Sequence, residues 1–173
     1  MSQSRATPRR PWRPLLEGAL RERALATVDE IVAALPGPES ALISDASLAR
    51  GAAGLAVLSA YLARAGRDDG TNAILFLQHA AQRISDEPTD HTLYGGFTGV
   101  AWALAHLRAQ LLDADEDAHE AVDAALLDLL SQTPWRHDFD LVNGLVGIGV
   151  YALEQLPRST AAEILSRVVE RLE

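Results

Sequence analysis

The stretch Leu93-Tyr94-Gly95-Gly96-Phe97-Thr98-Gly99-Val100-Ala101-Trp102 carries a glycine pair of spacing G-x-x-G at the start of an otherwise apolar segment. The same spacing occurs in Gly51-Ala52-Ala53-Gly54 and in Gly144-Leu145-Val146-Gly147, and a leucine lies three residues before each pair. The first glycines of the three pairs are 45 and 48 residues apart. Self-similarity at such a period is typical of a repeat architecture, so we interpret the chain as repeats of one structural unit.

Apolar residues recur at spacings of three and four along the chain, which is the period of an amphipathic helix. One further helical segment lies between consecutive glycine pairs, so each repeat is predicted to be a helical hairpin. We therefore predict an all-α chain of seven helices. They cover residues 14–35, 48–65, 71–84, 97–112, a fifth that opens within 113–120 and runs to 130, 144–156, and a last that opens with a capping box of Thr160 and Glu163.

Glycine in a helix interior costs about 1 kcal/mol relative to alanine, so its repeated use needs a structural cause. We interpret that cause as close approach between neighbouring helix backbones. The segments after the glycines, such as 145–153, carry no charged side chain, whereas the helices between them, such as 113–130, are charged on one face. We therefore expect two layers, with the glycine-bearing helices inside and their N-termini at one common end.

Composition excludes several classes of function. The net charge of −9 and the pI of about 5.0 make nucleic acid an unexpected partner, because an acidic surface repels phosphates. Cysteine is absent, which excludes disulfides, thiolate metal sites and a cysteine nucleophile. No apolar run approaches the ~18 residues of a membrane span. Arginine supplies all 15 basic residues, a usage typical of GC-rich bacterial genomes.

The N-terminal segment, residues 1–13, combines four arginines with prolines and is not followed by an apolar signal-peptide core. We expect it to be a solvated basic tail, with residues 14–173 forming the folded part. The cytoplasm is the expected compartment.

The glycine motifs resemble those of the lanthionine synthetase C-like family. The resemblance is carried by 93–102, by Asp140-Leu141-Val142-Asn143-Gly144-Leu145-Val146-Gly147-Ile148-Gly149-Val150-Tyr151, and by Ser47-Leu48-Ala49-Arg50-Gly51-Ala52-Ala53-Gly54. The family implies an α/α toroid of seven hairpins with G-x-x-G motifs on the inner helices. It implies a cyclase that adds cysteine thiols to dehydrated serine and threonine during lanthipeptide biosynthesis. Only three of the seven motifs are present, so we expect an incomplete toroid, the family's N-terminal half.

The resemblance also implies what this chain lacks. The family's catalytic zinc is held by two cysteines and a histidine in its C-terminal half, and its catalytic histidine lies at the fourth motif. We therefore expect no metal site or cofactor in this chain, zinc only in a complete family member, and no cyclase activity from the chain alone.

One residue, Asp140, matches a position that the family uses in acid–base chemistry, although an aspartate there is equally suited to cap the following helix. The inner-helix motifs comprise Gly51, Gly54, Gly96, Gly99, Gly144 and Gly147, and candidates for a pocket rim are Arg50, His91, Tyr94 and Asn143. We interpret the segment His137-Asp138-Phe139-Asp140 as a solvated loop rather than a metal site. We expect His106 to pack in the core with Trp102.

Expected partners are a dehydrated precursor peptide, a dehydratase, a second copy of the chain, or a missing C-terminal half. Two other classes of function stay open. The first is a noncatalytic peptide-binding or scaffold module built from half a toroid. The second, less favoured, is another α/α-toroid enzyme such as a glycosidase, which would need a second carboxylate to act with Asp140.

Overall fold

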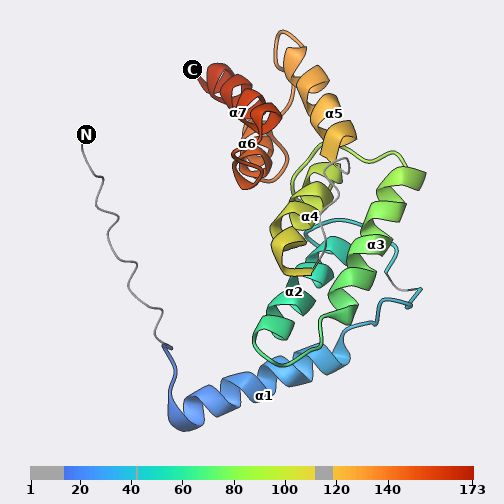
Figure 1. The fold of residues 1–173 in the computed structure, drawn as a ribbon, viewed down its shortest axis with the longest axis vertical. Coiled ribbons are helices and arrows are strands. Elements are labelled where there is room, and N and C mark those ends of the chain that lie inside the picture. The colour runs from blue at the N-terminus through green and yellow to red at the C-terminus, as the bar shows by residue number, and fades with distance from the viewer. Residues whose placement is uncertain (1–13, 42, 112–118) are drawn as a thin grey trace. The chain divides into compact units, whose positions relative to one another are not determined.

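The computed structural model describes residues 14–41, 43–111 and 119–173, and every regular element within these ranges is a helix (Figure 1). The chain forms two compact units, Met1–Pro36 and Gly37–Glu173. The first unit contains α1 (Gly18–Ala34), none of whose residues is buried. The helix begins later than the predicted residue 14, at a glycine whose φ of 52° is unfavourable for other residues.

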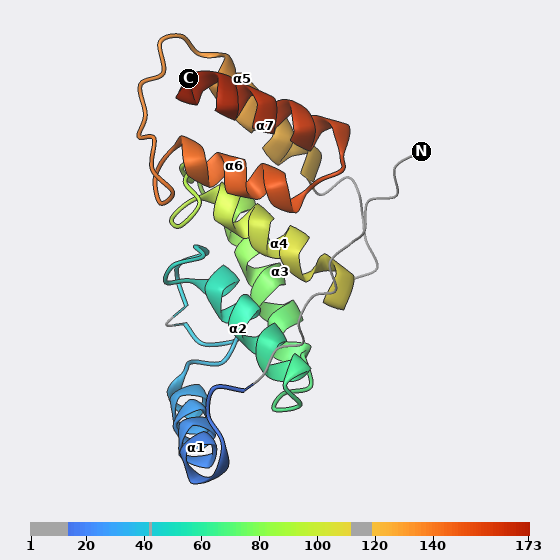
Figure 2. The ribbon, with the colours of Figure 1, turned by 90° about the vertical axis from the view of Figure 1, so that its left-hand side faces the viewer.

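The second unit contains the other six helices. They are α2 (Ala52–Arg64), α3 (Thr71–Asp86), α4 (Phe97–Leu111), α5 (Glu120–Ser131), α6 (Leu145–Glu154) and α7 (Ser159–Leu172). The three glycine-bearing helices form one row, because α4 contacts both α2 and α6 (Figure 2). The other helices pack beside this row: α3 contacts α2 and α4, and α7 contacts α5 and α6. The all-α repeat architecture predicted from the sequence is confirmed.

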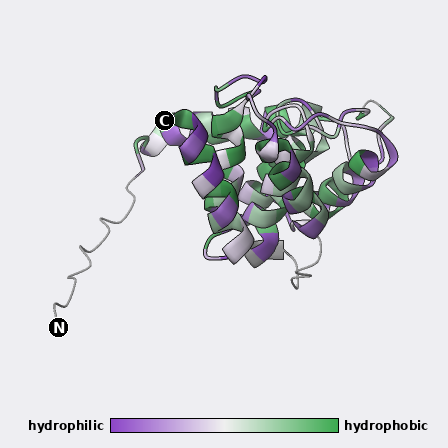
Figure 3. Cartoon of the chain, turned by 90° about the horizontal axis from the view of Figure 1, so that it is seen from above, coloured by the Kyte–Doolittle hydropathy of each residue, from purple (hydrophilic) through white to green (hydrophobic). Residues whose placement is uncertain are grey.

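Two apolar clusters form the core of this unit, and α4 contributes to both. Val100, Ala103 and Leu107 pack with residues of α2 and α3, whereas Ala101 packs with residues of α5, α6 and α7. The helices beside the row, α3, α5 and α7, each bury one face only. Figure 3 shows purple and green faces on α7, the helix that ends at the C label, in agreement with its buried and exposed residues. The clusters show why α4 must be apolar on two sides.

Several predicted helix limits are wrong. The second helix begins at Ala52 rather than Leu48, because residues 48–51 form a turn instead. The sixth helix ends at Glu154, two residues early. The predicted capping box is absent: the last helix already begins at Ser159, no side chain caps it, and the Glu163 carboxylate accepts from Arg167 at 2.6 Å. The predicted fifth-helix opening within 113–118 lies outside the described residues.

A buried polar network joins α5, α6 and the start of α7. The carboxylate of Asp123 accepts the Tyr151 hydroxyl at 2.7 Å and the Arg158 guanidinium at 2.8 Å. Burial, reinforced by the neighbouring Asp123, raises the pKa of Tyr151. Gln155 in turn donates to the Tyr151 hydroxyl at 3.3 Å. The network gives the buried Asp123 carboxylate and Tyr151 hydroxyl their partners, as burial requires, while Nη1 of Arg158 is buried without a partner among the described residues.

Candidate functional site

The N-terminal ends of α2, α4 and α6 are built the same way. The first N–H group of each helix donates to a backbone carbonyl. The residue that carries this carbonyl lies six positions before the first glycine of the motif. The three carbonyls are those of Asp45, Asp90 and Asp138, and the distances are 2.9, 2.9 and 3.0 Å to the N–H groups of Ala52, Phe97 and Leu145. A Cβ on the intervening glycine would overlap the same carbonyl oxygen. The first glycine therefore allows the preceding loop to supply the helix with an acceptor.

The second glycine of each motif meets the preceding leucine. A Cβ on Gly147 would lie 2.6 Å from the carbonyl oxygen of Leu141, and Gly54 and Gly99 meet the equivalent carbonyls of their own repeats. The glycines therefore do allow close approach, but the prediction that neighbouring helix backbones approach one another is wrong. The atoms nearest the motif glycines belong to loop residues.

Asp140 occupies the position of a hydroxyl residue in the other two repeats. Its Oδ1 atom accepts the N–H of Asn143 at 2.9 Å and that of Val142 at 2.6 Å. Four residues before the other first glycines, Ser47 accepts the N–H of Arg50 at 3.3 Å and Thr92 accepts that of Gly95 at 3.1 Å. Asp140 thus holds its loop by the same kind of bond while remaining exposed. The prediction that it caps the following helix is wrong, because the N-cap of α6 is Gly144 and no side chain bonds there.

Backbone hydrogen bonds connect the three loops. The N–H of Ala49 donates to the carbonyl of Tyr94 at 3.0 Å, and the N–H of Tyr94 donates to the carbonyl of Val142 at 3.3 Å. We refer to these connected loops, residues 43–51, 90–96 and 138–144, as the loop rim. It carries every candidate site residue predicted from the sequence except the second glycines, which lie in the first turns of the helices. Arg50 and Asn143 are exposed there.

Among the rim candidates, His91 is the one that meets other aromatic rings. Its centroid lies 4.6 Å from that of His137 and 6.4 Å from that of Trp135. Burial lowers the pKa of His91, and the neighbouring His137 lowers it further, while Asp90 acts in the opposite direction. The Nε2 atom of His91 is buried and has no hydrogen-bond partner among the described residues. A neutral imidazole is therefore favoured at this place.

Carboxylates that the sequence analysis overlooked lie in the other two loops. The Oδ1 atom of Asp45 accepts the N–H of Ser47 at 2.7 Å, and that of Asp90 accepts the N–H of Thr92 at 2.9 Å and its hydroxyl at 2.6 Å. Both are bonded within their own loops, so each has a structural role in the turn.

A second polar arrangement, at the C-terminal ends of the same helices, was not predicted. The Tyr61 hydroxyl lies 2.9 Å from Nε2 of His106, and Nδ1 of His106 lies 3.0 Å from a carboxylate oxygen of Glu154. Each residue follows the first glycine of its repeat by ten positions. His106 stacks on Trp102 as predicted, with ring centroids 4.7 Å apart, but it does not lie in the core: its side chain is 22% exposed and links three repeats. The equal offsets were the signal that could have revealed it.

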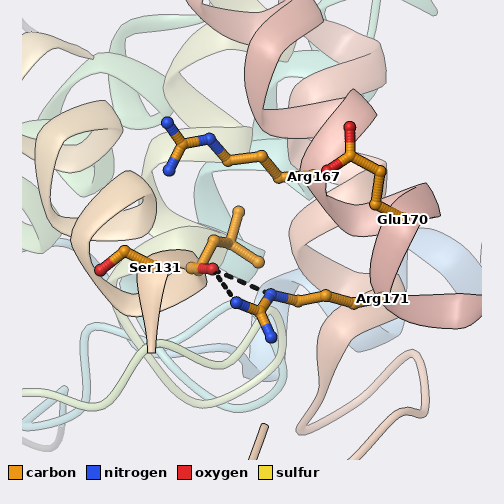
Figure 4. Close-up of a pocket in the computed structure, with 5 residues that line it drawn as sticks. Ser131, Arg167, Glu170 and Arg171 are labelled. Carbon is orange, nitrogen blue, oxygen red and sulfur yellow. Dashed lines mark hydrogen bonds between the residues drawn. The ribbon is translucent and has the colours of Figure 1, made fainter. Parts of the chain in front are cut away.

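Two pockets among the described residues are lined by no predicted site residue. One, of about 410 Å³, lies between the ends of α5 and α7 (Figure 4). There Arg171 donates to the carbonyl of Leu130 through Nε at 2.8 Å and also through Nη2, which caps the C-terminus of α5. The other, of about 400 Å³, is lined by residues of 84–89 together with Phe97, Ala121, Val122 and Ala125. The Arg171 contact stabilises the end of α5, and neither pocket points to a reaction.

The side chains within the described ranges form no group that fits a catalytic zinc. Zinc sites in proteins use cysteine, histidine and carboxylate ligands, commonly with at least three from the protein. The sequence contains no cysteine, and the described ranges contain no cluster of three or more potential ligands. The described residues therefore provide no site where zinc could activate a thiol.

Comparison with protein families matches residues 43–173 to the model of the lanthionine synthetase C-like protein. The match covers all three glycine motifs and the six helices of the second unit. The chain belongs to the lanthionine synthetase C-like family. No curated protein and no solved structure gives a match. Within the described ranges, no helix has the length and apolar character needed to cross a membrane.

Proposed function

We propose that this chain forms part of a lanthionine cyclase centre in the cytoplasm, with the loop rim facing a dehydrated precursor peptide. The observation that carries the proposal is the place of Asp140: an exposed carboxylate on the third loop of the rim, in a member of this family. The connected loops give the rim a fixed geometry around it.

The reaction needs a proton-handling group of this kind. A cysteine thiol adds to the β-carbon of dehydroalanine or dehydrobutyrine, so the new C–S bond leaves an enolate, and the proton lost by sulfur must be returned to the α-carbon. A positioned carboxylate can orient the group that returns it. Asp140 has a free Oδ2 for this purpose among the contacts of the described residues, since its two backbone bonds both use Oδ1.

The chain alone is proposed to form no thioether rings. Thiol activation has no candidate residue here, and residues that act as a unit lose most of their effect when separated. The test is elemental analysis of the purified chain, combined with mass spectrometry of a dehydrated precursor peptide treated with a thiol-alkylating reagent. We expect no stoichiometric zinc and no loss of alkylated thiols. Bound zinc at one equivalent, or thiols protected by the chain, would contradict the proposal.

A noncatalytic peptide-binding module is the second candidate function. One observation is in line with it: Asp140 makes the loop-holding bond that Ser47 and Thr92 make in the other repeats, so this residue has a structural role that requires no catalysis. This function predicts that the chain binds the dehydrated peptide and that a hydroxyl residue at position 140 leaves its function intact. Titration of a fluorescently labelled peptide measures the first property.

A further inference from the structure

The contact between consecutive repeats occurs twice in this chain with the same residues. A Cβ on Gly99 would lie 3.0 Å from the Cβ of Leu48, and a Cβ on Gly147 would lie 2.9 Å from the Cβ of Leu93. Thus the leucine of one repeat packs on the second glycine of the next. The loop hydrogen bonds repeat in the same direction, from each loop to the one that follows. The chain therefore uses one defined interface to join its repeats.

In the third repeat, the side of the interface that carries the leucine is exposed. Leu141 is 41% exposed, whereas the equivalent Leu93 is 4% exposed. On α6, Val146 and Leu153 are also exposed, while the residues at their register positions in α2, Ala53 and Ala60, are buried. We call Leu141, Val146 and Leu153 the α6 face. It is apolar, and the described residues leave it exposed.

The first repeat leaves the other half uncovered. Among the described residues, no side chain of another repeat lies within 4 Å of a Cβ built on Gly54, in contrast to Gly99 and Gly147. Leu58 is exposed on α2, whereas Ala103, at the same register position in α4, is fully buried in the cluster that α4 shares with α2 and α3. We call Gly54 and Leu58 the α2 face.

Charges at the C-terminal ends of these helices are complementary. Glu154 ends the hydrogen-bonded chain on α6, and its side chain is 33% exposed. At the other end of the row, the Arg64 guanidinium lies over the Tyr61 ring, 5.5 Å from its centroid. A helix that followed α6 with the register of α2 would bring a cation and a hydroxyl toward the Glu154 carboxylate.

We propose that a second copy of this chain docks head to tail, with its α2 face on the α6 face of the first copy. Leu141 then packs on Gly54 of the second copy, and Glu154 faces its Tyr61 and Arg64. The interface continues the one that joins the repeats within each chain. Because the two faces differ, docking is heterologous, and it closes into a ring or grows according to the rotation between copies. This interaction goes beyond the proposed cyclase role and does not depend on it.

The experiment measures mass against concentration by sedimentation velocity for two variants that each block one face. Leu153→Glu blocks the α6 face and Leu58→Glu blocks the α2 face; both sites are exposed, and glutamate is a good helix former. We expect the wild-type chain to associate, each variant alone to remain monomeric, and an equimolar mixture of both to form a heterodimer that grows no further. The mixture succeeds because each variant retains one intact face.

Val146→Glu provides a second block of the α6 face, and Val169→Glu, at an exposed apolar residue of α7, is the matched control that should associate like wild type. Circular dichroism establishes that each variant is folded. We expect each face variant to raise the dissociation constant at least tenfold, because docking would bury an unpaired carboxylate. A monomeric wild-type chain, association of either face variant alone, or a mixture without heterodimer would overturn the proposal.

Discussion

The Cβ atom of Leu93 lies 2.9 Å from the position that a Cβ atom on Gly147 would occupy, so the glycine is required for two repeats to meet. The carbonyl oxygen of Leu141 lies 2.6 Å from the same position. Backbone cannot move aside as a flexible side chain can, and this explains a glycine inside a helix, where its propensity is unfavourable.

Gly147→Ala is therefore expected to lower the free energy of unfolding by about 1–3 kcal/mol, the usual cost of overpacking. Gly149→Ala is the matched control in the same helix, since its nearest neighbour is Cγ1 of Val168 at 3.3 Å. The control should change stability by less than about 1 kcal/mol, because the gain in helix propensity offsets the contact. Urea denaturation measures both; equal effects would show that packing against Leu93 and Leu141 is not the cause.

Removal of the buried Asp123 carboxylate should destabilise the second unit. Asp123→Ala leaves the Tyr151 hydroxyl and the Arg158 guanidinium without their shared acceptor, at a cost of about 3 kcal/mol. Glu163→Ala is the control, because it breaks only a surface ion pair with Arg167 and should cost less than about 0.5 kcal/mol. Thermal unfolding followed by circular dichroism compares the two, and similar melting temperatures would contradict the role given to the network.

Stability should fall with pH below the ordinary pKa of histidine. Burial lowers the pKa of His119, and the nearby Arg158 and Arg108 lower it further, against the opposing effect of Asp123. The unfolded chain, with a histidine pKa near 6.5, therefore binds protons at a higher pH than the folded chain does. Unfolding is favoured as the pH falls from 6.5 toward the lower, folded-state pKa of His119. Well above pH 6.5 both states are deprotonated, so His119 no longer destabilises the fold.

His119→Phe should reduce this pH dependence. The measurement is the free energy of unfolding at pH 7 and pH 5 for the wild type and the variant, with His79→Phe as the control on α3. The wild type and the control should lose more stability between the two pH values than the His119 variant. An unchanged difference in the His119 variant would show that this residue does not contribute.

The sequence was sufficient for the helices and for the repeat, because glycine spacing and apolar period are local signals. Details that depend on contacts between segments were not predictable in the same way. The predicted helix includes residues 48–51, yet the observed helix begins only at Ala52, whose N–H donates to the carbonyl of Asp45. Asp123 is buried although aspartate is usually exposed. Its partner Arg158 lies 35 residues away in the sequence, so no local pattern predicts the pair.

For the candidate site, the sequence predicted the rim residues but not their bonds. The match of Asp140 to a catalytic position and its suitability as a cap were both visible, and the structure adds that Ser47 and Thr92 hold the same place in the other loops. The Tyr61–His106–Glu154 chain required the three repeats to be compared at equal offsets, well beyond the glycine motifs.

This equivalence gives the variant that separates the two roles of Asp140. Asp140→Thr introduces the residue that holds the second loop, so the loop should keep the N–H bond of Asn143, the equivalent of Gly95, while the carboxylate is lost. Asp140→Ala removes both the bond and the carboxylate, and it should also lower stability by about 1 kcal/mol, the usual net contribution of a hydrogen bond. The melting temperatures of the two variants establish whether the loop bond is retained.

The most direct test of the cyclase proposal is the rate of thioether formation on a dehydrated precursor peptide by this chain mixed with the zinc-binding C-terminal half of a complete family member. We expect the wild-type mixture to close rings. The Asp140→Thr mixture should close them at least about 100-fold more slowly, the usual contribution of a positioned acid–base group, without loss of stability. A wild-type mixture that closes no rings, or an Asp140→Thr mixture as fast as wild type, would contradict the account.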